Sequence, residues 1–332
     1  MTDSTPEAAE SSLPALRWVP PPVYFMHIPK TAGSSLQWIL KSAFWPGSVQ
    51  FIGGRAAMKF TVSELAGLRC VVSHLGNGLL PYLPQNGLQK ITVLRDPVER
   101  VVSLVNYRRT LWQEVPHWFD AEYVVKCKQY VNADLATWLD LFESDGNILA
   151  NGQSKTLCAV GDPRPFFRDG DIGRTKVLPR GNWVENLLPR EIDDAVLVER
   201  AHRQLEQVAV VGITENFAGT AELVCDVLGI AVPRALPVEN VGRSRTGGLG
   251  VGYRATTTPD VIARIEAMTT IDRELYLHGQ ELFMRQLARL RARKRRTICM
   301  LPRLCAPYWQ ARRTAGRVKH LLRTKLHLAL PA

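Results

Sequence analysis

Four short apolar runs, rich in β-branched and aromatic residues, constrain the fold of this 332-residue chain more than any other feature. They lie at residues 23–26, 70–72, 91–94 and 208–213. Three of them are followed by a loop and then by a helical pattern, at about 34–43, 98–111 and 217–228. Strand, loop and helix repeated in this order are typical of parallel βαβ units. We therefore predict an α/β protein with a central, mostly parallel β-sheet flanked by helices.

The remaining segments are predicted to be helical or to form loops. Two helices are expected in the middle of the chain, at 134–143 and 147–158. Frequent glycine and proline predict two long loops, at 161–181 and 231–256. Thr258 followed by Pro259 is a favourable helix start, so one long helix is expected from there to about Leu290.

The two ends of the chain differ in composition from its middle. Residues 1–22 are rich in Ser, Pro, Ala and Glu and predict a disordered leader. Residues 291–332 predict a basic, partly helical tail, which leaves 23–290 as one folded domain. The formal charge is +11, but the segment 285–332 holds fourteen Lys and Arg and no Asp or Glu. The rest of the chain has 28 basic and 31 acidic residues, so the charge does not indicate a nucleic-acid-binding domain.

Several features of the sequence predict a cytoplasmic protein. The N-terminus has no basic segment followed by an apolar one, so no secretory signal is expected. No run of about 18 apolar residues occurs, so no membrane span is expected. The six cysteines are scattered without a C-x-x-C pair, which is typical of reduced thiols and not of a zinc site.

The first candidate site is the segment 27–36, which lies between a predicted strand and a predicted helix. Backbone N–H groups at a helix N-terminus are unpaired and, with the helix dipole, favour a bound phosphate. Here Gly33 would allow close approach of the anion, Ser34 and Ser35 supply hydroxyl groups, and Lys30 supplies a charge. The Walker pattern G-x-x-x-x-G-K-[ST] is absent. The alternative is an ordinary turn capped by Ser34 with a solvated Lys30.

The second candidate site follows the third predicted strand. Arg95 leaves the carboxyl end of that strand, where open α/β sheets bind ligands, and Ser103 lies about two turns into the next helix. An arginine fork and a serine hydroxyl together can hold a phosphate. Two other interpretations remain open. Asp96 could be a magnesium ligand, and Arg100 could form a surface salt bridge with Glu99 or Asp96.

These segments resemble the two phosphate-binding motifs of sulfotransferases that use 3′-phosphoadenosine 5′-phosphosulfate (PAPS). The resemblance is to the carbohydrate family that includes heparan sulfate 2-O- and 6-O-sulfotransferases and bacterial cytoplasmic relatives. His27–Ser35 is similar to H-x-P-K-T-[AG]-[GS]-[ST]-[ST]. Leu94–Ser103 is similar to L-R-[DH]-P-x-x-R-x-x-S-x-[FY], although the aromatic residue falls at Tyr107. Weaker similarities are Asn151–Leu157 to N-x-Q-[ST]-[RK]-x-L and Val211–Phe217 to V-G-x-x-E-x-F.

The resemblance, over about residues 23–285, implies a P-loop-like three-layer fold and a division of roles. Lys30 would stabilise the oxygen that bridges phosphorus and sulfur during in-line transfer. Arg95 and Ser103 would bind the 3′-phosphate, and Arg243 would lie in a loop that closes over the nucleotide. No metal ion is expected. Thr31, Gly33, Ser34 and Ser35 would hold the 5′-phosphate. The cofactor-binding residues expected in this loop are Lys30, Thr31, Ala32, Gly33, Ser34 and Ser35.

A hydroxyl acceptor also needs a general base, and His74 is the candidate. Histidine titrates near neutral pH, and His74 follows the second predicted strand at the same sheet edge as the two motifs. Family members often have a base at this place. His27 is expected to be structural. The resemblance favours an acceptor hydroxyl on a carbohydrate or glycolipid.

Two other classes of function remain as alternatives. A P-loop-type phosphotransferase or kinase would bind ATP with magnesium, which the missing G-K-[ST] disfavours. A basic anion-binding or membrane-surface protein would act through its tail, in which Tyr308 and Trp309 accompany the Lys and Arg residues. Such a tail could also add a peripheral membrane or polyanion contact to an enzyme.

Overall fold

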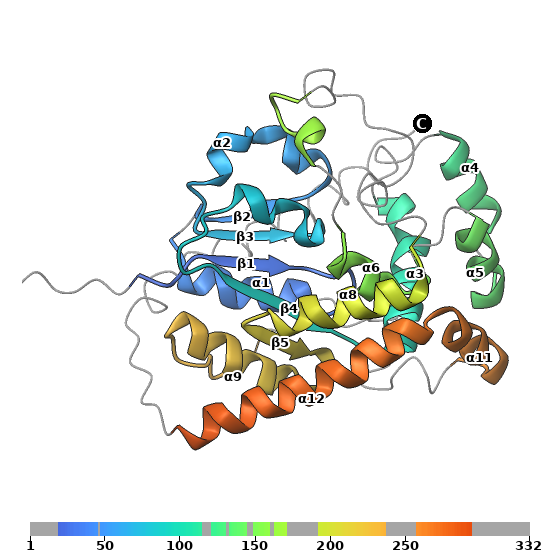
Figure 1. Cartoon of the computed structure of the whole chain (residues 1–332). Helices are drawn as coiled ribbons and strands as arrows, with labels where there is room; N and C mark the ends of the chain where they lie inside the picture. Colours follow the sequence, from blue (N-terminus) through green and yellow to red (C-terminus); the bar gives the residue numbers. More distant parts are fainter. Residues whose placement is uncertain are drawn as a thin grey trace, which may run out of the picture.

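A computed structural model defines the architecture, and Figure 1 shows it as a sheet with helices around it. The residues that the structure describes are 19–45, 47–114, 121–130, 133–144, 149–159, 163–170, 192–236 and 257–293.

Five parallel strands form one central sheet in the order β2-β3-β1-β4-β5. Their bounds are Val23–Met26 (β1), Val49–Ile52 (β2), Cys70–Ser73 (β3), Gln89–Leu94 (β4) and Val210–Ile213 (β5). The predicted α/β class is therefore confirmed, as are the four predicted strands. β2 was not predicted from the sequence. It lies at the edge of the sheet with Phe51 exposed, so it lacks the uninterrupted apolar run of a strand buried on both faces.

Helices lie between the strands along the chain and after the last strand. The longer ones are α1 (Gly33–Ala43), α3 (Pro97–Glu114), α4 (Ala121–Gln129), α5 (Leu135–Ser144), α8 (Asp194–Glu206), α9 (Phe217–Leu228), α11 (Pro259–Met268) and α12 (Thr270–Ala292). Two short helices are α2 (Val62–Leu65) and α6 (Gly152–Leu157), and short 3-10 helices lie at Gly54–Lys59, Gly76–Tyr82, Arg164–Phe166 and Thr214–Asn216.

Two helix predictions are corrected by the structure. The single helix expected from Thr258 to about Leu290 is divided at Thr269, which has non-helical dihedral angles and separates α11 from α12. The helix expected from residue 147 begins only at Gly152, because Asn151 adopts a left-handed conformation with φ 49°. Both changes occur where α6 and α12 meet.

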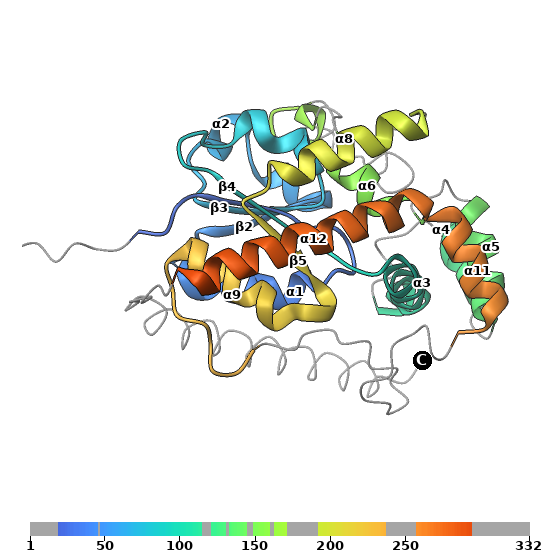
Figure 2. The same ribbon diagram turned by 60° about the horizontal axis from the view of Figure 1, so that its bottom comes forward.

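Helices cover both faces of the sheet. Neighbouring residues of β4 point to opposite faces, as the two-residue period of a strand requires. A Cβ added at Gly212 would lie 2.5 Å from Thr220 of α9 and 3.0 Å from Val93, so Val93 faces α9. A Cβ added at Gly279 of α12 would lie 2.4 Å from the Leu94 side chain, so Leu94 faces α12. Figure 2 shows α8 on one side of the sheet and α1 with α9 on the other.

The strand order places a topological switch point between β1 and β4. The chain leaves β1 toward β2 and β3 on one side and leaves β4 toward β5 on the other. Loops that leave two neighbouring strands in opposite directions open a crevice at their carboxyl ends, where open α/β sheets bind ligands. Those two loops begin at His27 and Arg95, so they are the two segments singled out in the sequence.

The described residues reach into both predicted end segments. Residues 19–22 lie against the sheet, where the Pro22 carbonyl accepts a hydrogen bond from Gln89 N at 2.8 Å. Arg291 still belongs to α12, and its guanidinium binds the Glu222 carboxylate through two hydrogen bonds of 3.0 and 3.2 Å. Residues 1–18 and 294–332 lie outside the described residues. None of the helices within the described ranges is long and apolar enough to cross a bilayer.

Candidate active site

The loop after β1 contains two residues in the left-handed region that are not glycine. Lys30 has φ 71° and Ala32 has φ 62°. Each such residue costs about 1–2 kcal/mol, and such strain persists where the surroundings enforce it, often at ligand-binding sites. Part of this enforcement comes from Thr31, which is buried and donates its hydroxyl to the Ile28 carbonyl at 2.9 Å.

The N-terminus of α1 has no hydrogen bond from the side chain of its N-cap residue. The N-cap residue is Ala32, whose methyl group cannot accept a hydrogen bond, and the first turn contains no acidic residue. The alternative interpretation, a turn capped by Ser34, does not fit the structure, since the helix begins at Gly33 with Ala32 as its N-cap. A helix N-terminus with neither a side-chain cap nor a carboxylate is favourable for an anion.

Gly33 is required at this helix start by the ring of His27. A Cβ at Gly33 would lie 1.8 Å from Nε2 of His27. The imidazole also stacks on Phe25, with ring centroids 5.2 Å apart. Burial, together with the neighbouring His74 ring and the charge of Lys30, holds the pKa of His27 well below its ordinary value, so the ring is neutral at pH 7. These contacts support the predicted structural role of His27.

In the loop after β4, the Asp96 side chain caps the helix that follows. Its Oδ1 accepts hydrogen bonds from the backbone N–H groups of Val98 (3.0 Å) and Glu99 (3.1 Å), and so caps α3. Its Oδ2 lies 3.4 Å from the Arg273 guanidinium. Both carboxylate oxygens are used within the protein, which disfavours the interpretation of Asp96 as a magnesium ligand. Among the described residues, no group of three or more His, Cys, Asp or Glu is arranged to hold a metal ion.

The two loops bring two cations together. Nη1 of Arg95 donates to the Lys30 carbonyl oxygen at 3.2 Å. Burial, together with the charge of Arg95, lowers the pKa of Lys30 to about 8. The Lys30 Nζ also lies 4.2 Å from the centroid of the Tyr107 ring, a distance at which a cation–π interaction stabilises the charged form. Lys30 and Arg95 therefore form one positively charged site at the switch point.

One side of α3 borders this site. Glu99, Ser103 and Tyr107 are spaced by four residues and so share a face of the helix. Glu99 Oε2 accepts a hydrogen bond from Arg95 Nη2 at 3.2 Å, and Tyr107 lies beneath Lys30. Ser103 is on the same face between the two. The predicted pairing of Arg95 with Ser103 at one site is compatible with this arrangement.

His74 is held at the same sheet edge by a short hydrogen bond. Its Nδ1 lies 2.6 Å from the His27 carbonyl oxygen, which can only accept, so Nδ1 carries the proton and Nε2 carries the lone pair. Burial lowers the pKa of His74, and the hydrogen bond to His27 opposes that effect. The ring of the exposed Phe51 meets His74 edge-on, with centroids 5.2 Å apart. A neutral imidazole with a free Nε2 lone pair is the form that a general base needs.

Residues of other elements hold the backbone of the second loop. The Gln153 side chain accepts from Arg95 N at 3.0 Å and donates to the Arg95 carbonyl at 2.9 Å. Glu215 Oε1 accepts from Asp96 N at 3.1 Å, and the Thr214 hydroxyl donates to the Leu94 carbonyl at 3.0 Å. Local sequence patterns assign no role to Gln153 or Glu215. Both lie in the two weaker motif similarities.

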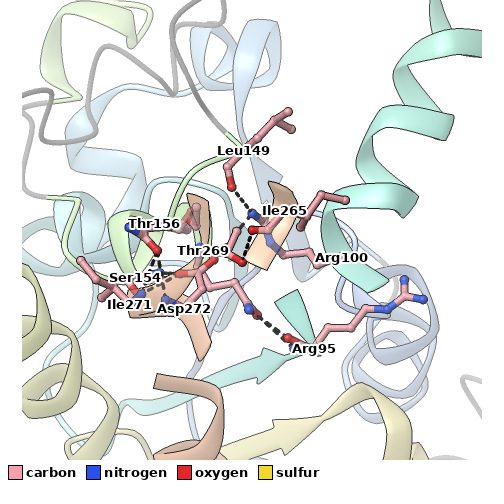
Figure 3. A network of polar contacts seen from close by, with 12 residues as sticks. Arg95, Arg100, Leu149, Ser154, Thr156, Ile265, Thr269, Ile271 and Asp272 are labelled. Carbon is pink, nitrogen blue, oxygen red and sulfur yellow. Dashed lines mark hydrogen bonds and ion pairs between the residues drawn. The ribbon is translucent and has the colours of Figure 1, made fainter. Parts of the chain in front are cut away.

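Helices α6 and α12 cap each other at their N-termini. The Asn151 Oδ1 accepts from the backbone N–H groups of Ile271 and Asp272, both at 3.1 Å, at the start of α12. In return, the Asp272 carboxylate accepts from the backbone N–H groups of Gln153 (3.0 Å) and Ser154 (2.8 Å) at the start of α6. Figure 3 shows this network beside Arg95, whose side chain points away from Asp272.

Arg100 completes this buried network, which corrects its interpretation as a surface residue. Its guanidinium is 3.6 Å from the Asp272 carboxylate and donates to the Leu149 carbonyl at 2.9 Å. Only 1% of Arg100 and none of Asp272 is exposed. Gly152 leaves the room that the guanidinium needs, since a Cβ there would lie 2.8 Å from Arg100 Nη2. We call Arg100, Asn151, Gln153, Ser154 and Asp272 the Asp272 cluster.

Other predictions lie partly or wholly outside this description. Arg243 and the aromatic residues of the tail are outside the described residues, so their roles stay predictions. The four described cysteines are buried with free thiols, as expected (Cys70, Cys127, Cys158 and Cys225). No protein-family model matches this sequence, and no curated protein matches it at a significant level. The function is therefore inferred from the motifs and from the geometry of the site.

The pKa of Lys30 leads to a prediction for the free protein. Lys30 is charged below a pH of about 8 and becomes neutral as the pH rises through that value. If the site binds a nucleotide phosphate, as the motifs predict, its affinity should be highest below pH 8 and should fall by up to about tenfold per pH unit above it. Calorimetric titrations between pH 7 and 9.5 measure this, since phosphate groups, with a second pKa of about 6, change little in charge over that range.

Lys30→Arg is the control for this pH dependence, because arginine stays protonated across the range. Its affinity profile should be flat. A wild-type profile that is also flat would contradict the assignment of Lys30 to the anion site.

Proposed function

We propose that this protein is a sulfotransferase that moves the sulfuryl group of PAPS to a hydroxyl acceptor. The main support is the contact between Lys30 and Arg95, which come from the loops after two neighbouring parallel strands. Two adjacent cations at a switch point favour a ligand with two separate anionic groups, and PAPS carries a 5′-phosphosulfate and a 3′-phosphate. The motif resemblance identifies the same two residues.

The roles follow from the positions of the side chains. The open N-terminus of α1, with Ser34 and Ser35, would hold the 5′-phosphate. Lys30 would stabilise the charge that develops on the oxygen leaving sulfur, because a preformed cation in a site shielded from water is most effective there. Arg95, with Ser103 on the neighbouring face of α3, would bind the 3′-phosphate through a charge-assisted fork.

His74 is proposed as the general base that takes the acceptor proton. Its Nε2 lone pair is available because the Nδ1 proton is committed to the His27 carbonyl. The acceptor would then bind beside the exposed Phe51 ring. A carbohydrate or glycolipid hydroxyl remains the acceptor class that the family resemblance favours.

Titration with the stable product 3′-phosphoadenosine 5′-phosphate (PAP) tests this proposal. PAP, ADP and AMP are compared by calorimetry, first without magnesium and then with it. We expect PAP to bind more tightly than AMP, and the difference to disappear in Arg95→Ala. Absence of PAP binding would overturn the proposal, and a preference for ADP that requires magnesium would favour the phosphotransferase alternative.

Substitution of Glu99 is predicted to raise the affinity for PAP, whereas substitution of Arg95 is predicted to lower it. The Glu99 carboxylate faces the Arg95 guanidinium at 3.2 Å and would repel a phosphate bound there. Glu99→Gln should therefore raise the affinity for PAP by about fivefold, the change that about 1 kcal/mol produces. AMP is the control ligand because it lacks the 3′-phosphate, and its affinity should not change. A loss of PAP affinity would instead show that Glu99 is needed to orient Arg95.

A further inference from the structure

We infer that Gln153 is a positioning residue for the 3′-phosphate half of the site and sets the preference for 3′-phosphorylated nucleotides. This inference rests on the proposed function. It starts from the observation that the carboxamide of Gln153 binds both backbone polar groups of one residue, Arg95. Just after the end of β4, the amide thereby makes the two backbone hydrogen bonds that a neighbouring strand would otherwise make.

Gln153 is completely buried, which is costly for a carboxamide unless its hydrogen bonds are made. The two bonds to Arg95, of 3.0 and 2.9 Å, meet that requirement. An apolar side chain of similar volume would fill the same space without contacting the Arg95 backbone polar groups. The carboxamide therefore adds a directional constraint on one residue in addition to filling the core.

The turn that carries Arg95 is held at three consecutive residues. Thr214 binds the Leu94 carbonyl, Gln153 binds the N–H and carbonyl of Arg95, and Glu215 binds the Asp96 N–H. Of these contacts, only those of Gln153 reach the residue whose side chain would bind the ligand. They fix the point from which the guanidinium extends toward Lys30 and Glu99.

Gln153 is itself anchored by a residue of α12 that lies 119 positions later in the sequence. Its backbone N–H is bound by the Asp272 carboxylate at 3.0 Å, and its side chain extends from there to Arg95. This gives a continuous buried connection from α12 through α6 to the loop after β4. Displacement of a binding group by about 1 Å can cost about 100-fold in activity, so loss of this support should be measurable in ligand affinity.

The test compares PAP with AMP, which lacks only the 3′-phosphate, by calorimetry without magnesium. The variants are Gln153→Met, which keeps the volume and removes both hydrogen bonds, and Gln153→Asn, which keeps the amide but shortens its reach. Ser154→Ala is the matched control, because Ser154 lies in the same helix and its hydroxyl binds Asp272 and not Arg95. Thermal unfolding of each variant is measured in parallel.

We expect Gln153→Met to weaken PAP binding by about 10- to 100-fold while AMP binding stays within about twofold. Gln153→Asn should fall between Gln153→Met and the wild type, and Ser154→Ala should keep the wild-type ratio of PAP to AMP affinity. An unchanged ratio in a folded Gln153 variant would overturn the inference and leave the proposed function intact. Equal losses for both nucleotides would also overturn it, because they would indicate a general structural role. Absence of PAP binding by the wild-type protein would overturn the proposed function and this inference with it.

Discussion

If the protein is the sulfotransferase proposed above, replacement of Lys30 by alanine is expected to slow sulfuryl transfer from PAPS by about 10²- to 10³-fold. The loss is expected because the Lys30 ammonium group lies where the two loops meet, and Arg95, the neighbouring cation, would be engaged by the 3′-phosphate. The rate is measured as release of sulfate from PAPS, with water as the acceptor. The affinity for PAP should fall much less than the rate, since Arg95 and the start of α1 would still bind the nucleotide.

Two variants serve as controls for this result. Lys41→Ala removes the same charge from the last turn of α1, at the end of the helix away from the site, and should leave the rate unchanged. Lys30→Arg keeps the charge but not the compact shape of an ammonium group. Its affinity for PAP should therefore be closer to the wild-type value than its rate of sulfate release. A rate for Lys30→Ala within a few-fold of the wild type would remove Lys30 from the mechanism.

Replacement of Asp272 by alanine is expected to lower the free energy of unfolding by about 3–5 kcal/mol. It would leave the buried Arg100 guanidinium without its counter-charge, 3.6 Å away, and the N–H groups of Gln153 and Ser154 without an acceptor. Buried donors that lose their partner bear the full cost of desolvation. Urea unfolding of the wild type and the variant measures the difference.

An exposed ion pair provides the matched control for Asp272. Asp140 on α5 lies 2.6 Å from Arg264 on α11, with a side chain that is 66% exposed. Asp140→Ala removes an equivalent charge pair and should cost at most about 1 kcal/mol. A double variant of Arg100 and Asp272 should lose less than the sum of the two single variants, since the second substitution removes a group that the first left unpaired. Equal costs for Asp272→Ala and Asp140→Ala would contradict the role of burial.

The sequence predicts the strands of this fold well where both faces are buried. β1, β3, β5 and residues 91–94 of β4 are buried and mostly apolar, because helices cover both sides of a parallel sheet. The bounds of α9 are also predicted, because Asn216 caps its start at Gly219 N and Gly229 ends it at φ 65°. The edge strand β2 has no such signal, because one of its aromatic side chains remains exposed.

The division between α11 and α12 could not be predicted from the local pattern. The helical pattern continues through Thr269, and the new helix start is capped by Asn151, more than one hundred residues earlier. The same holds for the site. The positions of Lys30, Arg95 and His74 at strand ends follow from local patterns, but the contacts of Gln153 with Arg95 join residues 58 positions apart. Such support depends on the tertiary arrangement, which no local window contains.

The mutual capping of α6 and α12 has a consequence for the order in which the protein becomes functional during synthesis. The strands and loops that carry Lys30, His74 and Arg95 leave the ribosome first, yet the carboxylate that anchors Gln153 belongs to Asp272. The nascent chain therefore cannot complete the support of Arg95, and with it the proposed donor site, until α12 has been made and docked. Premature termination before α12 would yield a chain that retains the loops after β1 and β4 but lacks the anchor for Gln153.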